Sequence, residues 1–126
     1  MKPEDLVNVE PGFWTVIEKA GRSQETLRGL LGEMSRQEIE RFNSSFEWAI
    51  AELSADDFRD VHGYSRDEMY ELAGWIASQG WDFYSRVYDN PSELPRLEQI
   101  DWDSFLCYVV YEVYEKRFGE SLPYTG

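Results

Sequence analysis

Two copies of the same helix-start signal constrain this chain more than any other feature of its sequence. Ser35 is followed three residues later by Glu38, and Ser65 is followed in the same way by Glu68. In such a pair the serine hydroxyl accepts the backbone N–H of the third residue, and the glutamate carboxylate accepts the serine N–H in return. Each pair therefore predicts a helix that begins directly after its serine.

The residues after each start keep the spacing that one face of a helix requires. Apolar side chains recur at every third or fourth position, which is typical of a helix with one buried side. After the second helix, Gly80 predicts a left-handed helix end, an aromatic helix follows, and Asn90-Pro91 stops it. The two apolar stripes consist of Ile39, Phe42, Phe46, Ala49, Ile50 and Leu53, and of Met69, Leu72, Ala73 and Ile76.

Other segments predict further helices from similar signals. Apolar stripes within residues 13–20 and 27–31 predict two helices near the N-terminus. Ser54 predicts the cap of a short helix from Ala55, and Asp101 predicts the cap of the last helix. We find no alternating segment bounded by hairpin turns. The expected fold class is therefore all-α, a bundle of six or seven short-to-medium helices.

The chain has 126 residues, a length that fits one domain. We expect residues 1–126 to form a single helical domain. Residues 1–9 have the character of a loose N-terminal arm, and residues 119–126 that of a C-terminal tail. Residues 91–100 contain two prolines and predict a connector.

The last helix is apolar on two sides, which leaves two interpretations open. A helix that is apolar nearly all round is usually buried. Alternatively, one of its stripes faces a partner, and a homodimer through residues 104–118 would cover it. One stripe contains Phe105, Leu106, Val109 and Val113, and the other contains Cys107, Val110, Tyr111, Tyr114 and Phe118.

Charge narrows the class of partner. The formal net charge is −13, and residues 51–115 hold fifteen acidic and four basic side chains. Direct binding to nucleic acid or to an anionic membrane needs a positive surface, so we expect neither. An acidic surface favours a basic protein partner, or it serves solubility alone.

No apolar run is long enough to suggest a membrane span or a leader, and we expect a cytoplasmic protein.

Candidate catalytic residues are few. His62 is the one histidine and stands at a predicted helix end, where a structural or surface role is expected. Cys107 is the one cysteine, and within an apolar helix it is expected to be an inert buried thiol. The spacing of Asp57, Asp60 and His62 matches no familiar metal-ligand pattern. We therefore predict no metal, no cofactor and no enzyme active site.

Packing and turn residues between Gly12 and Leu94 form a recognisable pattern. Its residues are Phe13, Trp14, Ile17, Leu27, Leu31, Glu38, Phe42, Ser65, Asp67, Met69, Gly74, Trp75, Ile76, Gly80, Tyr84, Asn90 and Pro91. In this pattern the chain resembles a bacterial family known as domain of unknown function 4240, and the resemblance implies a shared fold but supplies no activity. The polar stretch DDFRDVHGY before Ser65 departs from the apolar run of the family.

These observations favour an acidic helical protein-binding module. The most concrete form is an immunity or antitoxin-like inhibitor that covers a basic toxin such as a nuclease, because complementary charge speeds encounter and aromatic anchors hold a complex. Trp48 lies off the apolar stripe of its helix, so it either covers a neighbouring helix or anchors a partner. The predicted contact surface is Trp48, Asp56, Asp57, Asp60, Asp67, Glu68 and Glu71.

Two other functions remain open from the sequence. One is a small-molecule-binding or enzymatic helical domain, whose pocket would lie around Trp75, Trp81, Tyr84 and Trp102. The other is self-assembly through the spare apolar stripe of the last helix.

Overall fold

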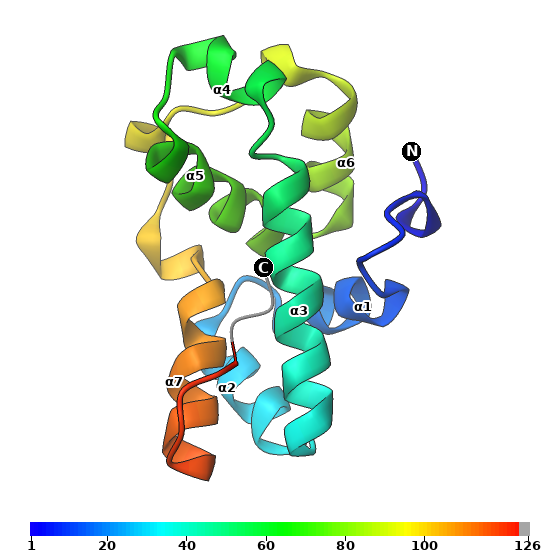
Figure 1. Cartoon of the computed structure of the whole chain (residues 1–126), viewed down its shortest axis with the longest axis vertical. Coiled ribbons are helices and arrows are strands. Elements are labelled where there is room, and N and C mark those ends of the chain that lie inside the picture. Colours follow the sequence, from blue (N-terminus) through cyan, green and yellow to red (C-terminus); the bar gives the residue numbers. More distant parts are fainter. Residues whose placement is uncertain (124–126) are drawn as a thin grey trace.

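The structure is all-helical, as the sequence predicts. It is a computed structural model that describes residues 1–123 (Figure 1), and within that range it has seven α-helices and no β-strand. None of the helices in this range is long and apolar enough to cross a membrane. The α-helices are α1 (Pro11–Ala20), α2 (Gln24–Gly32), α3 (Arg36–Glu52), α4 (Asp56–His62), α5 (Arg66–Ser78), α6 (Trp81–Asp89) and α7 (Cys107–Phe118). Short 3-10 turns are η1 (Pro3–Asp5), η2 (Pro91–Glu93), η3 (Leu97–Gln99) and η4 (Trp102–Ser104).

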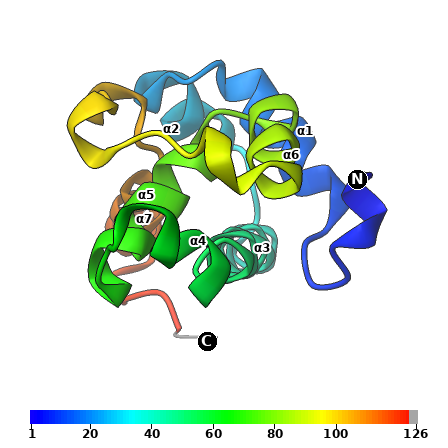
Figure 2. The same cartoon turned by 90° about the horizontal axis from the view of Figure 1, so that it is seen from above.

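The longest helix, α3, is the centre of the packing. It contacts α1, α5 and α7, and Figure 2 shows α1, α2 and α6 on one side of the molecule with α3, α5 and α7 on the other. Aromatic rings fill much of the core beside α1. The Trp14 ring lies 4.8 Å from Phe13, 5.1 Å from Trp81 and 4.8 Å from Tyr84, measured between ring centres.

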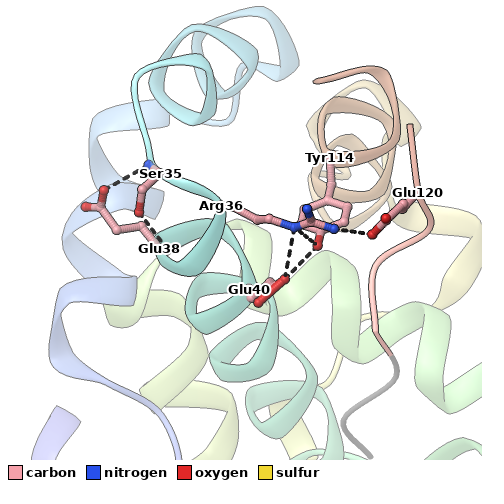
Figure 3. Close-up of polar contacts among 6 residues, drawn as sticks. All are labelled: Ser35, Arg36, Glu38, Glu40, Tyr114 and Glu120. Atoms are coloured by element: carbon pink, nitrogen blue, oxygen red, sulfur yellow. Dashed lines mark hydrogen bonds and ion pairs between the residues drawn. The ribbon is translucent and has the colours of Figure 1, made fainter. Parts of the chain in front are cut away.

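Both predicted capping boxes are present. The Ser35 hydroxyl accepts the Glu38 N–H at 3.1 Å, and the Glu38 carboxylate accepts the Ser35 N–H at 2.9 Å (Figure 3). Ser65 and Glu68 repeat the arrangement at 3.2 and 2.9 Å. The bonds satisfy donors that a helix start otherwise leaves without a partner, so they fix where α3 and α5 begin.

The capping box of α3 makes a testable contribution to stability that depends on pH. The Ser35 backbone N–H, and then its side chain, lower the pKa of Glu38. A lowered folded-state pKa stabilises the protein above the unfolded pKa of about 4.3, and this contribution is lost as the pH falls through the folded pKa. We expect Glu38→Gln, which keeps a hydrogen-bond acceptor but no charge, to have a lower unfolding midpoint at pH 6. In thermal unfolding, the difference in midpoint between the variant and the original protein should shrink as the pH approaches 3. A gap of constant size over this range would contradict the assignment.

Residues 1–9 do not form the loose arm that was predicted. Pro3–Asp5 forms η1, and the side chains of Leu6 and Val9 are buried in the core. Two apolar side chains three residues apart place one side of this segment against the helices. The prediction of a loose arm was wrong because Leu6 and Val9 are buried against the helices, which holds the segment in place.

Two of the predicted helix boundaries differ in detail. The Ser54 hydroxyl donates to the Ile50 carbonyl at 2.8 Å, and Ala55 occupies the cap position of α4. Gly80 does not end α5 in the left-handed helical conformation. With φ 108° and ψ 171°, it stands directly before α6, and α5 already ends beside Gln79. A positive φ with an extended ψ is open essentially to glycine alone.

The last helix begins at Cys107, later than the predicted start after Asp101. The Asp101 carboxylate instead accepts the Ser104 hydroxyl at 2.6 Å within η4. Phe105 is extended, with φ −85° and ψ 115°, and its ring packs against α5 at Gly74. The chain needs this extended residue to place the ring, so the helix starts only after it.

A polar network fastens the end of α7 to the start of α3 (Figure 3). Arg36 donates to the Tyr114 hydroxyl at 2.9 Å, and that hydroxyl donates to the Glu40 carboxylate at 2.6 Å. Arg36 also pairs with Glu120 beyond α7. Arg117 donates to two backbone carbonyls at and just after the end of α2, at 2.8 and 2.7 Å. These bonds hold α7 in place at its C-terminal end.

The predicted tail, residues 119–126, begins with a helix stop. Gly119 has φ 70° and ends α7 in the left-handed conformation that glycine favours. Leu122 is buried, so this part of the tail is packed. Residues 124–126 of the predicted tail lie outside the described residues.

Candidate functional site

A groove lies on the surface where α3, α5 and α7 meet. Its volume is about 220 Å³, and three exposed tyrosines, Tyr70, Tyr108 and Tyr111, stand around it. Exposed aromatic rings give a large contact area and are enriched where proteins bind partners. We call this site the tyrosine groove; it is lined by Asn43, Phe46, Glu47, Ile50, Tyr70, Cys107, Tyr108 and Tyr111.

The close approach of α5 and α7 sets the width of the tyrosine groove. A side chain at Gly74 would place its Cβ 3.1 Å from the Phe105 ring and 3.5 Å from the Cys107 sulfur, so the absence of one lets the helices approach. The buried Ser78 hydroxyl donates to the Gly74 carbonyl at 2.7 Å and accepts the Leu106 N–H at 3.0 Å. The start of α7 is therefore fixed to α5 both by packing and by hydrogen bonds.

Two carboxylates give the tyrosine groove a negative character. Glu47 on α3 accepts the Tyr111 hydroxyl at 2.8 Å and the Asn43 amide at 3.3 Å. Burial, and then the hydrogen bond to Glu47, raise the pKa of Tyr111. Burial also raises the pKa of Tyr108, with smaller contributions from its neighbour Cys107 and from Glu71 on α5. Glu71 therefore lies beside the tyrosine groove.

The aromatic surface continues past the tyrosine groove. Tyr108, which is 56% exposed, also lines a neighbouring hollow of about 230 Å³, together with Trp102, which is 53% exposed. The Phe105 ring lies between them, 5.0 Å from Tyr108 and 5.5 Å from Trp102. Exposed aromatic rings thus run from α5 across α7 to η4.

The seven residues predicted to contact a partner lie on three helices. Glu71 lies beside the tyrosine groove, whereas Glu68 serves the capping box of α5 and Asp56 pairs with Arg59 in α4. That the set forms one contact surface stays a prediction. The set is Trp48 on α3, Asp56, Asp57 and Asp60 on α4, and Asp67, Glu68 and Glu71 on α5.

Trp48 is not among the residues that line the tyrosine groove. It follows Glu47 directly, and successive residues of a helix lie about 100° apart around its axis. Its side chain is 39% exposed. The exposed part of the Trp48 side chain is accessible to a partner, so its role as an anchor stays a prediction. Neighbouring residues of the chain cover the rest of the side chain.

The structure divides the aromatic residues of the alternative pocket between different places, although Trp81 and Tyr84 stack with their ring centres 6.0 Å apart. Trp75 donates its indole N–H to the Asp101 carbonyl at 3.0 Å. Tyr84 is fully buried. Trp81 lines a hollow of about 360 Å³ beside α1, whereas Trp102 lines the hollow beside Tyr108. The predicted pocket around these four residues is therefore not a single cavity.

The candidate catalytic residues have structural surroundings. His62 lies 3.0 Å from the Leu94 carbonyl, so its Nε2 donates to the connector after α6. Cys107 is buried, and burial raises the pKa of its thiol to about 12. A thiol with such a pKa is not a nucleophile near neutral pH. Within residues 1–123, no group of three or more His, Cys, Asp or Glu side chains could hold a metal ion.

Both apolar stripes of α7 are largely buried within the chain. Val109 and Val113 represent one stripe and Val110 and Tyr114 the other, and all four are buried. Interior burial is therefore the interpretation that fits α7. A homodimer through residues 104–118 stays a prediction, and it would use the exposed aromatic residues of the helix.

Sequence reasoning missed Glu47, Tyr70 and Tyr108, which lie close together in the fold. One signal was available, because Tyr70 and Tyr108 are aromatic residues outside the apolar stripes of their own helices. Glu47 gave no such signal, since an acidic residue between apolar ones is typical of any solvated helix face.

Comparison with known proteins places the chain in a family. No curated protein matches it, and no solved structure matches it. Residues 9–118 match a family described as "Protein of unknown function (DUF4240)". This range contains every residue of the tyrosine groove and extends the resemblance noted for residues 12–94. The chain belongs to the DUF4240 family.

Proposed function

We propose that this protein is an acidic helical protein-binding module, most concretely an immunity or antitoxin-like inhibitor of a basic toxin such as a nuclease. The observation that carries the proposal is the tyrosine groove, in which exposed aromatic rings stand together with the Glu47 carboxylate, and Glu71 lies beside it. Aromatic anchors supply much of the affinity of protein complexes, and negative charge selects a basic partner. We place the protein in the cytoplasm as part of this proposal.

Charge supports the choice of a basic partner. The net charge of −13 accelerates encounter with a cationic protein and opposes encounter with nucleic acid. The acidic residues of α4 add to this field, since Asp57 and Asp60 are exposed. We therefore assign the exposed acidic residues of α4 a role in encounter and the tyrosine groove a role in holding the complex.

The rigidity of the groove walls also supports binding. α3 and α5 begin in capping boxes, and α7 is fixed to α5 by Ser78 and to α3 through Tyr114. A site that needs no ordering on binding keeps more of its contact energy as affinity. An inhibitor that must act quickly at low concentration gains from such a site.

Affinity capture tests the proposal. The purified chain is immobilised and incubated with lysate from its native organism, and the bound proteins are eluted at low and at high salt. We expect a basic protein that is retained at low salt and weakened at high salt, because salt screens charge attraction. Its enzymatic activity, measured on its own, should then be inhibited by an equimolar amount of this chain.

Two results would contradict the proposal. One is that no basic protein is retained at either salt concentration. The other is that a retained basic protein keeps its full activity in a saturated complex, which would leave a binding module without an inhibitory role.

A further inference from the structure

The tyrosine groove has the chemistry of a receptor for a planar cation. A cation over the face of an aromatic ring is attracted by the ring, and the attraction grows where water is displaced. The groove combines three exposed tyrosine rings with the Glu47 carboxylate, which Tyr111 and Asn43 hold in position. The arginine guanidinium is planar, weakly hydrated, stacks on aromatic rings and pairs with carboxylates, whereas the lysine ammonium is compact and strongly hydrated.

The chain already holds one of its own arginines with this combination of groups. The Arg36 guanidinium lies 5.5 Å from the centre of the Tyr114 ring and 5.3 Å from that of Phe118. Its nitrogens also pair with the carboxylates of Glu40 and Glu120 (Figure 3). Rings and carboxylates thus surround an arginine at the opposite end of α7 from the tyrosine groove.

The size of the tyrosine groove indicates how much of a partner enters it. Its volume of about 220 Å³ is below the roughly 300–1,000 Å³ of typical small-molecule sites. A groove of this size suits one long side chain. Its mostly apolar walls suit the aliphatic stem of such a side chain, and its carboxylate suits a charged end.

We propose that the tyrosine groove receives one arginine side chain of the basic partner, with the guanidinium against the rings of Tyr108 and Tyr111 and paired with Glu47. This inference rests on the proposed function, because the arginine belongs to the partner. Beyond the proposed function, it specifies that the recognised group is a guanidinium and that this group binds in the tyrosine groove. Recognition of a guanidinium also explains why the groove presents rings and a carboxylate together.

Short peptides test the inference without the partner. The probe is N-acetyl-Gly-Arg-Gly-amide, and the comparisons are the same peptide with lysine or with citrulline, which has the shape of arginine without its charge. NMR titration of the full chain follows the ring resonances of the three groove tyrosines and the side-chain amide of Asn43. We expect saturable shifts with an arginine Kd on the order of 1 mM. The lysine peptide should bind about fivefold more weakly, and the citrulline peptide should not bind.

Variants locate the site. Glu47→Gln should weaken arginine binding about tenfold, since it removes a charge-assisted pair. Glu98→Gln on η3 is the matched control, because Glu98 is exposed and the net charge changes by the same amount. It should leave the Kd within about twofold. If Glu47→Gln fails to fold, Tyr108→Leu replaces it, because an exposed side chain can be changed without disturbing the core; this variant should weaken binding by at least about threefold.

Several outcomes would overturn the inference. They are the absence of shifts, equal binding of the citrulline peptide, preference for lysine, and an equal loss with Glu98→Gln. Shifts of the same tyrosines with rising protein concentration alone would assign the groove to a second copy of this chain. If a basic partner is captured and inhibited while the arginine peptide does not bind, the proposed function stands and this inference fails. If the peptide binds the groove but no basic partner exists, the proposed function fails instead.

Discussion

Trp14→Ala should remove about 3–5 kcal/mol from the free energy of unfolding, the usual cost of deleting a large buried aromatic side chain. Trp14 is 3% exposed and contacts Phe13, Trp81 and Tyr84, so its loss leaves a cavity between α1 and α6. A domain of this size is stable by about 5–15 kcal/mol. Urea unfolding followed by circular dichroism measures the change, and the unfolding midpoint of the variant should fall to a clearly lower urea concentration.

Two further variants make this expectation specific. Trp102→Ala removes the same side chain from an exposed position and should cost less than about 1 kcal/mol. Trp14→Phe should cost less than Trp14→Ala, because it keeps a ring in the core. Both substitutions also remove a buried indole N–H that has no hydrogen-bond partner within residues 1–123. Burying an unpaired donor costs about 1–3 kcal/mol, so its removal offsets part of the lost packing. Equal losses for Trp14→Ala and Trp102→Ala would contradict the assignment of Trp14 to the core.

The fold class could be predicted because its signals are local. The capping boxes at Ser35 and Ser65 depend on residues three positions apart, and both are present in the structure. Helical spacing of apolar residues is equally local, and it placed α3 and α5 correctly. These signals do not depend on how the helices pack, which is why they suffice to identify an all-helical chain.

The predictions failed where packing between distant segments decides the local structure. Asp101 has the sequence of a helix cap, yet α7 begins only after Phe105 has placed its ring beside Gly74. Leu6 and Val9 hold the N-terminal segment in place only because the helices offer them a surface. No short-range pattern contains that information.

Of the candidate site, only the negative charge could be predicted from the sequence. Composition predicts an acidic surface and a basic partner, but the tyrosine groove joins Glu47, Tyr70 and Tyr108, which are far apart in the sequence. Their meeting depends on the crossing of α3, α5 and α7. Glu71 was predicted for its charge and lies beside the tyrosine groove, and its role in binding a partner stays a prediction.

The strongest effect on partner binding should come from reversing the charge of Glu47 in the tyrosine groove together with that of Glu71 beside it. Glu47→Lys combined with Glu71→Lys would place positive charge where a basic side chain must enter. Truncating one partner of a buried charge pair costs about 2–5 kcal/mol, and a reversal adds repulsion. We therefore expect the affinity for the captured basic partner to fall by at least about 100-fold. Surface plasmon resonance measures it, with circular dichroism as the check on folding.

A matched pair on α4 decides which surface holds the partner. Asp56→Lys combined with Asp60→Lys changes the net charge by the same amount, at exposed positions of the surface predicted from the sequence. If that surface serves encounter, this variant should slow association at low salt, by about tenfold or less, and leave dissociation unchanged. Unchanged binding would remove Asp56 and Asp60 from the contact surface. A larger loss for this pair than for Glu47 and Glu71 would place the contact on α4, because a change of charge acts most strongly where it lies closest to the partner.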